Sequence, residues 1–291
     1  HKNVVCVCGA HGKTTTSSMI AETLLECGMD PTVHIGGRLD ALGGGSRIGG
    51  KDVFVAEACE FHGSFLEMHP TVAVVLNIDA DHLDYYQDID HIQAAFGKFL
   101  SLVPPSGTAL GWGEDARIQA LFETLNCETR TFGMNEANDY YPAHLTYNDT
   151  GCPRYDVMYR GEKLCHVELQ VAGSFNVINS LAAFAAAHVV GADPAEAAAS
   201  LSRFAGVHRR FELTGVIDGV KMYHDYGHNP TEMRAALSVA RQQHPRRLWA
   251  VMQPHTFSRV KTLFNDYLTC TQIADYTLVT DIFAAREKDP G

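Results

Sequence analysis

The sequence has no apolar run that approaches the ~18–20 residues of a membrane span, so it predicts no membrane-spanning helix. Its eight cysteines include no Cys-x-x-Cys pair and no zinc-finger spacing, which argues against a structural zinc site. Basic residues are outnumbered, with 23 Lys and Arg against 34 Asp and Glu and a net charge of −11. Because a nucleic-acid-binding protein would normally present a basic face, we expect small phosphate ligands instead, in a reducing cytoplasm and away from membranes.

A phosphate-binding loop is the clearest motif that is present. A β-branched run ends in two glycines, a lysine and three threonines: Gly9-Ala10-His11-Gly12-Lys13-Thr14-Thr15-Thr16. The glycines allow backbone N–H groups to turn toward an anion, and the start of the next helix adds unpaired N–H groups. Lys13 would face the β/γ-phosphates and Thr14 a magnesium ion. The usual first glycine is Val7 here, and a plain glycine turn is the alternative, but the strand–loop–helix context favours a phosphate site.

A metal site is predicted at the ends of two strands. Residues 53–57 and 71–78 are continuous apolar runs, as expected for buried parallel strands, and polar residues follow each of them. Ligands bind at the carboxyl edge of such a sheet, so Thr14, Glu57 and His82 are expected to converge on one metal–phosphate site. Glu57 as a helix N-terminal charge and His82 as a solvated turn residue are the alternatives. Magnesium prefers oxygen ligands, which makes His82 the chemically less usual member.

The remaining pattern predicts an α/β chain of two domains, a size that suits 291 residues. The first is expected to be a P-loop-type domain on a mainly parallel sheet, with an antiparallel β excursion between residues 140 and 171. The glycine-rich residues 34–50 are expected to form no regular element, and composition does not decide between a substrate clamp and a flexible hairpin. A boundary near residues 206–212 gives domains 1–207 and 208–291.

The second domain is predicted to be a β-α-β-α-β series. Its strands are expected at residues 220–224, 248–252 and 276–280, with helices at 230–243 and 258–273. Two of these strands are followed by polar clusters, residues 225–230 and 253–259, which we expect at the ligand-binding edge.

Several motifs together resemble one known family. They are Gly9-Ala10-His11-Gly12-Lys13-Thr14-Thr15-Thr16, Glu57-Ala58-Cys59-Glu60, Asn77-Ile78-Asp79-Ala80-Asp81-His82-Leu83-Asp84, Asn176-Val177-Ile178-Asn179, Arg209-Arg210-Phe211-Glu212, Asp225-Tyr226-Gly227-His228-Asn229-Pro230 and Gln253-Pro254-His255. In this combination and order they resemble the Mur ligases. That family has a UDP-sugar-binding N-terminal domain, a central ATPase and a Rossmann-like C-terminal domain. The resemblance covers the last two, so we expect a fragment that lacks the first domain and part of the third.

The resemblance implies an ATP-dependent carboxylate–amine ligase of the alanine-adding branch. ATP and Mg²⁺ would convert the lactyl carboxylate of UDP-N-acetylmuramate to an acyl phosphate, which L-alanine then attacks, in the bacterial cytoplasm. A monomer or weak homodimer is expected. A ligase of the same superfamily with another acceptor, of the peptide-recycling or folyl-glutamate type, is the nearer alternative. A non-catalytic nucleotide-binding module is the other.

The resemblance also implies a role for individual residues. It assigns catalytic roles to Lys13, Glu57, His82, His228 and His255. Contacts with ATP fall on Gly9, His11, Gly12, Lys13, Thr14 and Thr15 at the phosphates, on Asn176 and Asn179 at the adenine, and on Arg209, Arg210 and Asp225. Metal contacts fall on Thr14, Glu57 and His82, and substrate contacts on Tyr226, His228, His255 and Arg259.

This sequence departs from the family pattern at three positions. Cys59 replaces an aspartate, Phe175 stands where histidine often precedes the adenine-contacting asparagine, and Thr256 stands where some relatives have arginine. The last change leaves Arg259 as the expected partner of the substrate carboxylate.

Overall fold

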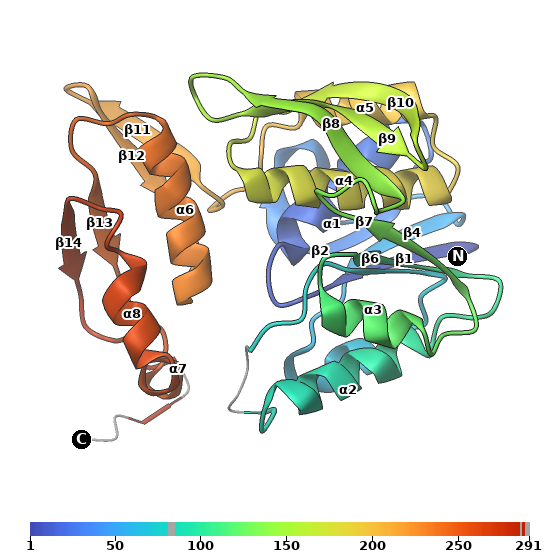
Figure 1. Ribbon diagram of the computed structural model, residues 1–291, viewed down its shortest axis with the longest axis horizontal. Helices are drawn as coiled ribbons and strands as arrows, with labels where there is room; N and C mark the ends of the chain where they lie inside the picture. The colour runs from blue at the N-terminus through green and yellow to red at the C-terminus, as the bar shows by residue number, and fades with distance from the viewer. Residues whose placement is uncertain (81–84, 286, 289–291) are drawn as a thin grey trace. The chain divides into compact units, whose positions relative to one another are not determined.

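The computed structural model describes residues 1–80, 85–285, 287 and 288, which divide into two compact units (Figure 1). One unit comprises residues 1–148 and 152–208, and the other comprises 149–151 and 209–291. In the described part of the chain no helix is long and apolar enough to cross a membrane.

The first unit is built on one sheet. Among its described residues the strand order is β10-β9-β8-β7-β6-β5-β1-β4-β2-β3. The strands are β1 (Asn3–Cys8), β2 (Thr32–Leu39), β3 (Gly44–Arg47), β4 (Val53–Glu57), β5 (Val72–Val75), β6 (Thr108–Trp112), β7 (Glu128–Phe132), β8 (Tyr140–Tyr147), β9 (Pro153–Tyr159) and β10 (Glu162–Glu168). The helices are α1 (Lys13–Glu26), α2 (Ile89–Leu100), α3 (Ala116–Phe122), α4 (Ser174–Val189) and α5 (Pro194–Arg203), with 3₁₀ helices η1 (Asp40–Leu42) and η2 (Phe61–Glu67).

The central strands are parallel, as predicted. β1 pairs in parallel with both β4 and β5, and β6 and β7 continue the parallel order. The predicted antiparallel excursion is also confirmed, because β8, β9 and β10 form antiparallel pairs. A parallel contact between Phe132 and Tyr140 joins this excursion to the main sheet.

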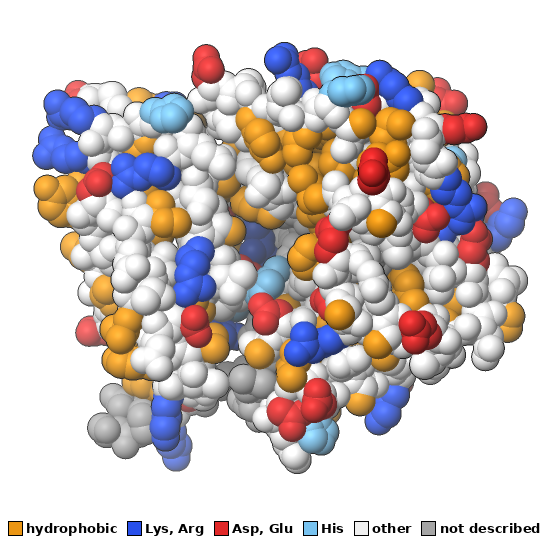
Figure 2. Space-filling model, in the orientation of Figure 1, with side chains coloured by type: hydrophobic (Ala, Val, Ile, Leu, Met, Phe, Trp, Pro, Cys, Tyr) orange, Lys and Arg blue, Asp and Glu red, His pale blue; other side chains and the backbone are white. Residues whose placement is uncertain are grey.

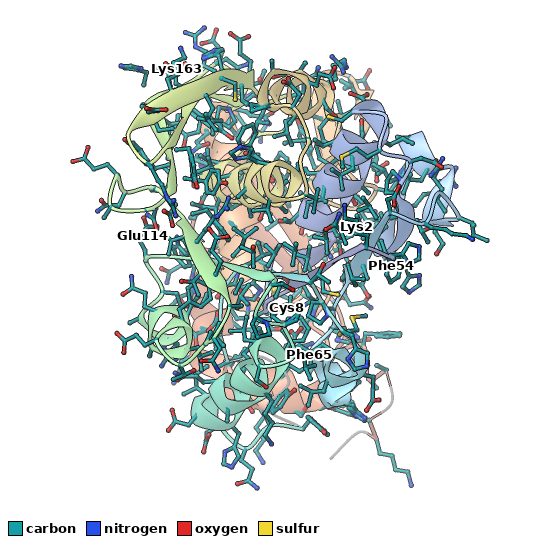
Figure 3. All side chains as sticks on the ribbon, turned by 90° about the vertical axis from the view of Figure 1, so that its right-hand side faces the viewer. Lys2, Cys8, Phe54, Phe65, Glu114 and Lys163 are labelled. Carbon is teal, nitrogen blue, oxygen red and sulfur yellow. The ribbon has the colours of Figure 1, made fainter. Side chains whose placement is uncertain are left out.

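Helices cover both faces of this sheet, α1, α4 and α5 on one side and α2 and α3 on the other (Figure 1). β1 shows why its sequence is apolar throughout: Val5 and Val7 belong to the core under α1 and α4, whereas Cys6 and Cys8 belong to the core over α2. Figure 3 shows Cys8 on the sheet and Phe65 beside α2. Some hydrophobic side chains also reach the surface over β8 and β9 (Figure 2).

The prediction of an irregular glycine-rich loop at residues 34–50 is wrong. β2 and β3 form an antiparallel pair there, and β2 also pairs in parallel with β4. The glycines serve close strand contact, since a Cβ added to Gly45 would lie 2.8 Å from the Gly37 carbonyl oxygen.

The second unit contains two small sheets in its described residues. Its elements are β11 (Glu212–Ile217), β12 (Val220–His224), α6 (Pro230–Gln242), β13 (Trp249–Met252), α7 (Phe257–Thr262), α8 (Phe264–Cys270) and β14 (Tyr276–Val279). β13 and β14 are parallel, as expected. The prediction missed β11, which forms an antiparallel hairpin with β12. The single helix predicted at 258–273 is two helices, because Leu263 departs from helical geometry and packs on the small core around Met252.

We expect Phe65→Ala to destabilise the first unit by about 3–5 kcal/mol, because Phe65 is fully buried and truncation would leave a cavity. Its ring stacks on Phe99 at 4.9 Å and meets the edge of Phe96 at 5.3 Å. Urea unfolding followed by circular dichroism measures the loss. Ile48→Ala is the matched control, since Ile48 is 94% exposed and should tolerate the change. A loss below about 1 kcal/mol in Phe65→Ala would contradict the described packing.

Candidate active site

The predicted phosphate-binding loop connects β1 to α1, and both of its glycines have positive φ. Gly9 has φ +138° and Gly12, at the N-cap of α1, has φ +86°, which side chains rarely allow. Space is also limiting, because a Cβ on Gly12 would lie 2.6 Å from Asn179 Oδ1. The backbone conformation therefore favours glycine at both positions, and close packing requires it at Gly12 as well. The loop carries the N-terminus of the 14-residue helix α1, which suits an anion.

Asn77, at the end of β5, holds this loop by two backbone contacts. Its Oδ1 accepts from the His11 N–H at 2.9 Å, and its Nδ2 donates to the His11 carbonyl oxygen at 3.0 Å. The His11 ring hydrogen-bonds Asp79 at 3.0 Å, and this bond lowers the pKa of Asp79. His11 is thus brought to the loop, as predicted, but Asn77 was not predicted as a site residue. Its position directly after a buried strand was the available signal.

The Lys13 side chain folds back over the loop, toward the residues that precede it. Its Nζ donates to the Gly9 carbonyl oxygen at 2.5 Å, to that of Ala10 at 3.4 Å and to Glu60 Oε1 at 3.0 Å. Its side chain is 13% exposed and that of Glu60 is 3% exposed. Burial lowers the pKa of Lys13, but the neighbouring acidic groups, Glu60 foremost, together more than offset this, so the pKa lies above its ordinary value. Lys13 is therefore a fixed cation at the loop.

Glu57 and Thr14 lie against consecutive glycines of β2. The Gly36 N–H donates to Glu57 Oε2 at 2.8 Å, and a Cβ on Gly37 would lie 2.6 Å from Thr14 Cγ2. The structure therefore brings these two predicted metal ligands to the same edge of the sheet. His82 lies outside the described residues.

Hydroxyl and carboxylate oxygens are the donor types that Mg²⁺ prefers. Within residues 1–80, 85–285, 287 and 288 no group of three or more His, Cys, Asp or Glu side chains could hold a metal by itself. This arrangement fits Mg²⁺, which usually takes one or two protein ligands and completes its shell with substrate phosphates and water.

Two buried asparagines on α4 support the loop from the other side. Asn179 Oδ1 accepts from the Thr16 hydroxyl at 3.3 Å, and Asn179 Nδ2 donates to Asn176 Oδ1 at 3.1 Å. Asn176 in turn donates to the Ala172 carbonyl oxygen at 2.8 Å. This network fixes α4 to the start of α1. Contact with adenine remains a prediction for both residues.

In the second unit the four predicted substrate residues form one cluster. Arg259 Nη1 is 3.0 Å from His255 Nδ1 and donates to the His255 carbonyl oxygen at 3.0 Å. The ring centroids of His228 and His255 are 5.5 Å apart, and those of Tyr226 and His228 are 5.6 Å apart. Burial, the neighbouring His228 and the Arg259 cation together lower the pKa of His255. His255 is therefore a neutral imidazole near pH 7.

The predicted residues Arg209, Arg210 and Asp225 adjoin this cluster. The guanidinium groups of Arg209 and Arg210 lie 4.3 Å and 5.4 Å from the centre of the Tyr226 ring, within cation–π range. Asp225 Oδ2 accepts from the Phe211 N–H at 2.8 Å, and its Oδ1 accepts from the Gly227 N–H at 2.6 Å. Asp225 thus ties the segment before β11 to the segment after β12.

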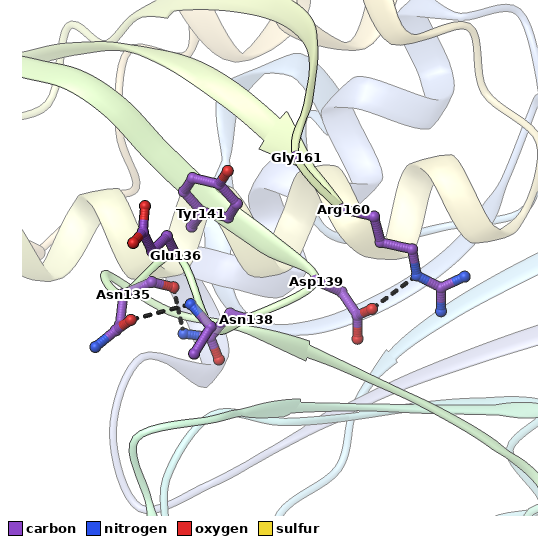
Figure 4. A pocket seen from close by; sticks show the side chains of 8 residues that line it. Asn135, Glu136, Asn138, Asp139, Tyr141, Arg160 and Gly161 are labelled. Atoms are coloured by element: carbon purple, nitrogen blue, oxygen red, sulfur yellow. Dashed lines mark hydrogen bonds and ion pairs between the residues drawn. The ribbon is translucent and has the colours of Figure 1, made fainter.

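A surface pocket of about 600 Å³ lies elsewhere in the first unit, between the β7–β8 connection and the β9–β10 turn (Figure 4). Its rim includes an ion pair between Arg160 and Asp139 at 2.8 Å. None of the predicted site residues lines this pocket.

The chain is similar to curated ligases. It is 43% identical over 291 residues to the UDP-N-acetylmuramate–L-alanine ligase of Caldanaerobacter subterraneus subsp. tengcongensis, covering 100% of this chain and 63% of that protein. It is 43% identical over 288 residues to the enzyme of the same name from Acetivibrio thermocellus, covering 99% of this chain and 61% of the relative. The chain therefore spans just under two thirds of these relatives.

A solved structure and the family models agree with this similarity. The UDP-N-acetylmuramate–alanine ligase MurC of Thermotoga maritima superposes with a TM-score of 0.81 at 27% identity, covering 97% of this chain and 62% of that one. The Mur ligase middle domain matches residues 7–187, and the Mur ligase glutamate ligase domain matches residues 209–290. The chain belongs to the Mur ligase family.

Proposed function

We propose that this chain forms the nucleotide-binding and C-terminal parts of an ATP-dependent ligase that joins L-alanine to UDP-N-acetylmuramate in peptidoglycan precursor synthesis. The observation that carries the proposal is the Lys13 cation fixed across a two-glycine loop, with Thr14 and Glu57 beside it. The names of the similar proteins support the choice of substrates. In this proposal residues 1–207 are the central domain and 208–291 belong to the C-terminal domain. The protein works in the bacterial cytoplasm as a monomer or weak homodimer.

The loop residues act on the phosphates of ATP. Backbone N–H groups of residues 9–15 and the start of α1 surround the phosphate oxygens, and Lys13 neutralises charge on the β/γ-phosphates. Because phosphoryl transfer needs positioning and charge stabilisation more than covalent chemistry, a preset cation is the main contribution of this unit. Asn176 and Asn179 are assigned to the adenine side of the same nucleotide.

Thr14 and Glu57 are assigned to one Mg²⁺ and His82 to a second. The bound ions would neutralise charge on the transferred phosphate. Gly36 fixes one oxygen of Glu57 through its N–H, which orients the carboxylate before any ion binds.

The cluster of the second unit is assigned to the remaining groups. Arg209, Arg210 and Asp225 are assigned to ATP, and Tyr226 and His228 to the substrates. Arg259 offers a guanidinium suited to a carboxylate, such as that of alanine or of the muramoyl group. His255 is neutral near pH 7 and can accept a hydrogen bond from the attacking amine. Transfer of the γ-phosphate of ATP to the muramoyl carboxylate leaves ADP and gives an acyl phosphate, and attack of the amine on this acyl phosphate forms the amide and releases inorganic phosphate.

We expect Lys13→Ala to weaken Mg·ATP binding and ligation on the order of 100–1000-fold or more, since it removes the preset cation. Isothermal titration calorimetry with ATP and MgCl₂ measures the binding. Lys51→Ala, which removes an exposed lysine from the same unit, is the control and should bind normally. A near-normal affinity in Lys13→Ala would refute the phosphate-loop assignment.

We expect L-alanine to be the preferred acceptor in the full-length protein. Product formation from UDP-N-acetylmuramate and ATP would be compared for L-alanine, glutamate and a preformed tripeptide. The tripeptide arm is needed because a ligase of the peptide-recycling type is the nearer alternative. A strong preference for glutamate or the tripeptide would replace the proposed reaction by that of another family member.

We expect His255 to titrate below the ordinary histidine pKa of about 6.5, because burial and nearby positive charge disfavour its protonated form. Removing one cation in Arg259→Gln should raise the pKa, while burial keeps it below the ordinary value. NMR titration of the imidazole resonances in the nucleotide-free protein measures both values. Arg246→Gln changes an exposed arginine before β13 and serves as the control. An unchanged His255 pKa in Arg259→Gln would contradict the contact.

A further inference from the structure

Glu60 lies beside the phosphate-binding loop, and the proposed mechanism gives it no role. Its side chain is 3% exposed, and both carboxylate oxygens lie 3.0 Å from Lys13 Nζ. A carboxylate so deeply buried is costly unless a positive partner is held close to it. Lys13 is that partner here.

Glu60 provides the charged contact of Lys13 Nζ among the described residues. An ammonium group has three N–H donors, and two of them point to carbonyl oxygens of the loop itself, those of Gly9 and Ala10. Glu60 comes from a different part of the chain, three residues beyond the end of β4. It therefore ties the lysine to the sheet edge that also carries Glu57.

The segment that presents Glu60 is itself fixed. The Tyr86 hydroxyl donates to the Glu60 carbonyl oxygen at 2.6 Å, and burial raises the pKa of Tyr86 to about 12, so it remains a donor at neutral pH. The preceding carbonyl oxygen, of Cys59, accepts from the Phe65 N–H at 3.1 Å and from the Ser64 hydroxyl at 2.9 Å. The carboxylate thus comes from an anchored backbone.

We propose that Glu60 is a positioning residue that holds the Lys13 ammonium in place over the loop for the phosphates of the nucleotide. Lysine is a flexible point charge, and fixing it in advance avoids an entropic cost when the phosphates bind. The proposal rests on the phosphate-binding function proposed above. It differs from a metal-ligand role for Glu60, in which the carboxylate would act on Mg²⁺ and not through Lys13.

The first test needs no nucleotide. Lys13→Met removes the cation beside the buried Glu60 carboxylate, and Glu60→Gln removes the carboxylate charge beside the Lys13 ammonium. We expect each single substitution to lower Tm by about 5 °C or more. The double variant should be at least as stable as the less stable of the two single variants, because it contains neither of the two charges. Additive losses of stability would show that the two side chains are not coupled and would overturn the proposal.

The second test measures Mg·ATP binding by calorimetry. Glu60→Gln should weaken binding on the order of tenfold, the factor that corresponds to about 1.4 kcal/mol for one charge-assisted contact, and Glu60→Asp should restore part of it. In the Lys13→Met background, Glu60→Gln should cause no further loss. Glu67→Gln, which changes an exposed acid at the end of η2, is the matched control.

Tyr86→Phe provides a gentler variant should Glu60→Gln fold poorly. It removes one hydroxyl and keeps the buried ring, so we expect a smaller loss of Mg·ATP affinity that again disappears in the Lys13→Met background.

The remaining outcomes separate the alternatives. If Glu60→Gln mainly raises the Mg²⁺ concentration needed for half-maximal binding, and does so equally in the Lys13→Met background, Glu60 is a metal ligand and the proposal is wrong. If the wild-type chain binds no Mg·ATP while the two charges remain coupled in unfolding, the proposed nucleotide function fails and the Lys13–Glu60 pairing stands.

Discussion

The parallel register of β1 with its two neighbours is the constraint on which the candidate site depends. Val7 lies opposite Glu57 of β4, and Cys8 lies opposite Val75 of β5, so these three strands end at one edge. Each strand end then supplies a different part of the site: the glycine loop follows β1, Glu57 ends β4 with Glu60 shortly after it, and Asn77 follows β5. Three segments that are distant in sequence meet because parallel strands present all their carboxyl ends together.

This edge combines attraction for an anion with two nearby carboxylates. The loop and Lys13 are positive toward a ligand, whereas Glu57 and Glu60 add negative charge within the same few residues. The balance suits a polyphosphate that arrives with a divalent cation better than a bare anion. It also explains how a chain with a net charge of −11 can hold phosphate without any broad basic surface.

Much of this arrangement could be predicted from the sequence, because strand identity and the carboxyl-edge rule depend on local pattern. β4 and β12 have the predicted bounds, and Thr14 and Glu57 are brought together. Glu60 was named only as part of the Glu57-Ala58-Cys59-Glu60 motif and was given no role, because its contact with Lys13 depends on the path of the chain after β4 and not on local pattern. The 34–50 hairpin was missed for a related reason: glycine content suggested a loop, whereas pairing with β4 decides the conformation. The break at Leu263 depends on tertiary packing in the same way.

The composition of α4 limits which substitutions this helix can tolerate. Ala182, Ala183, Ala185, Ala186 and Ala187 are fully buried, and α4 packs on α1. The same helix carries Asn179, which accepts a hydrogen bond from the first turn of α1 and lies beside Gly12. A larger side chain at one of these alanines would push α4 away from its neighbours and would shift Asn179 with it. Natural variation at these alanines is therefore limited by the alignment of the loop, and not by the volume of the core alone.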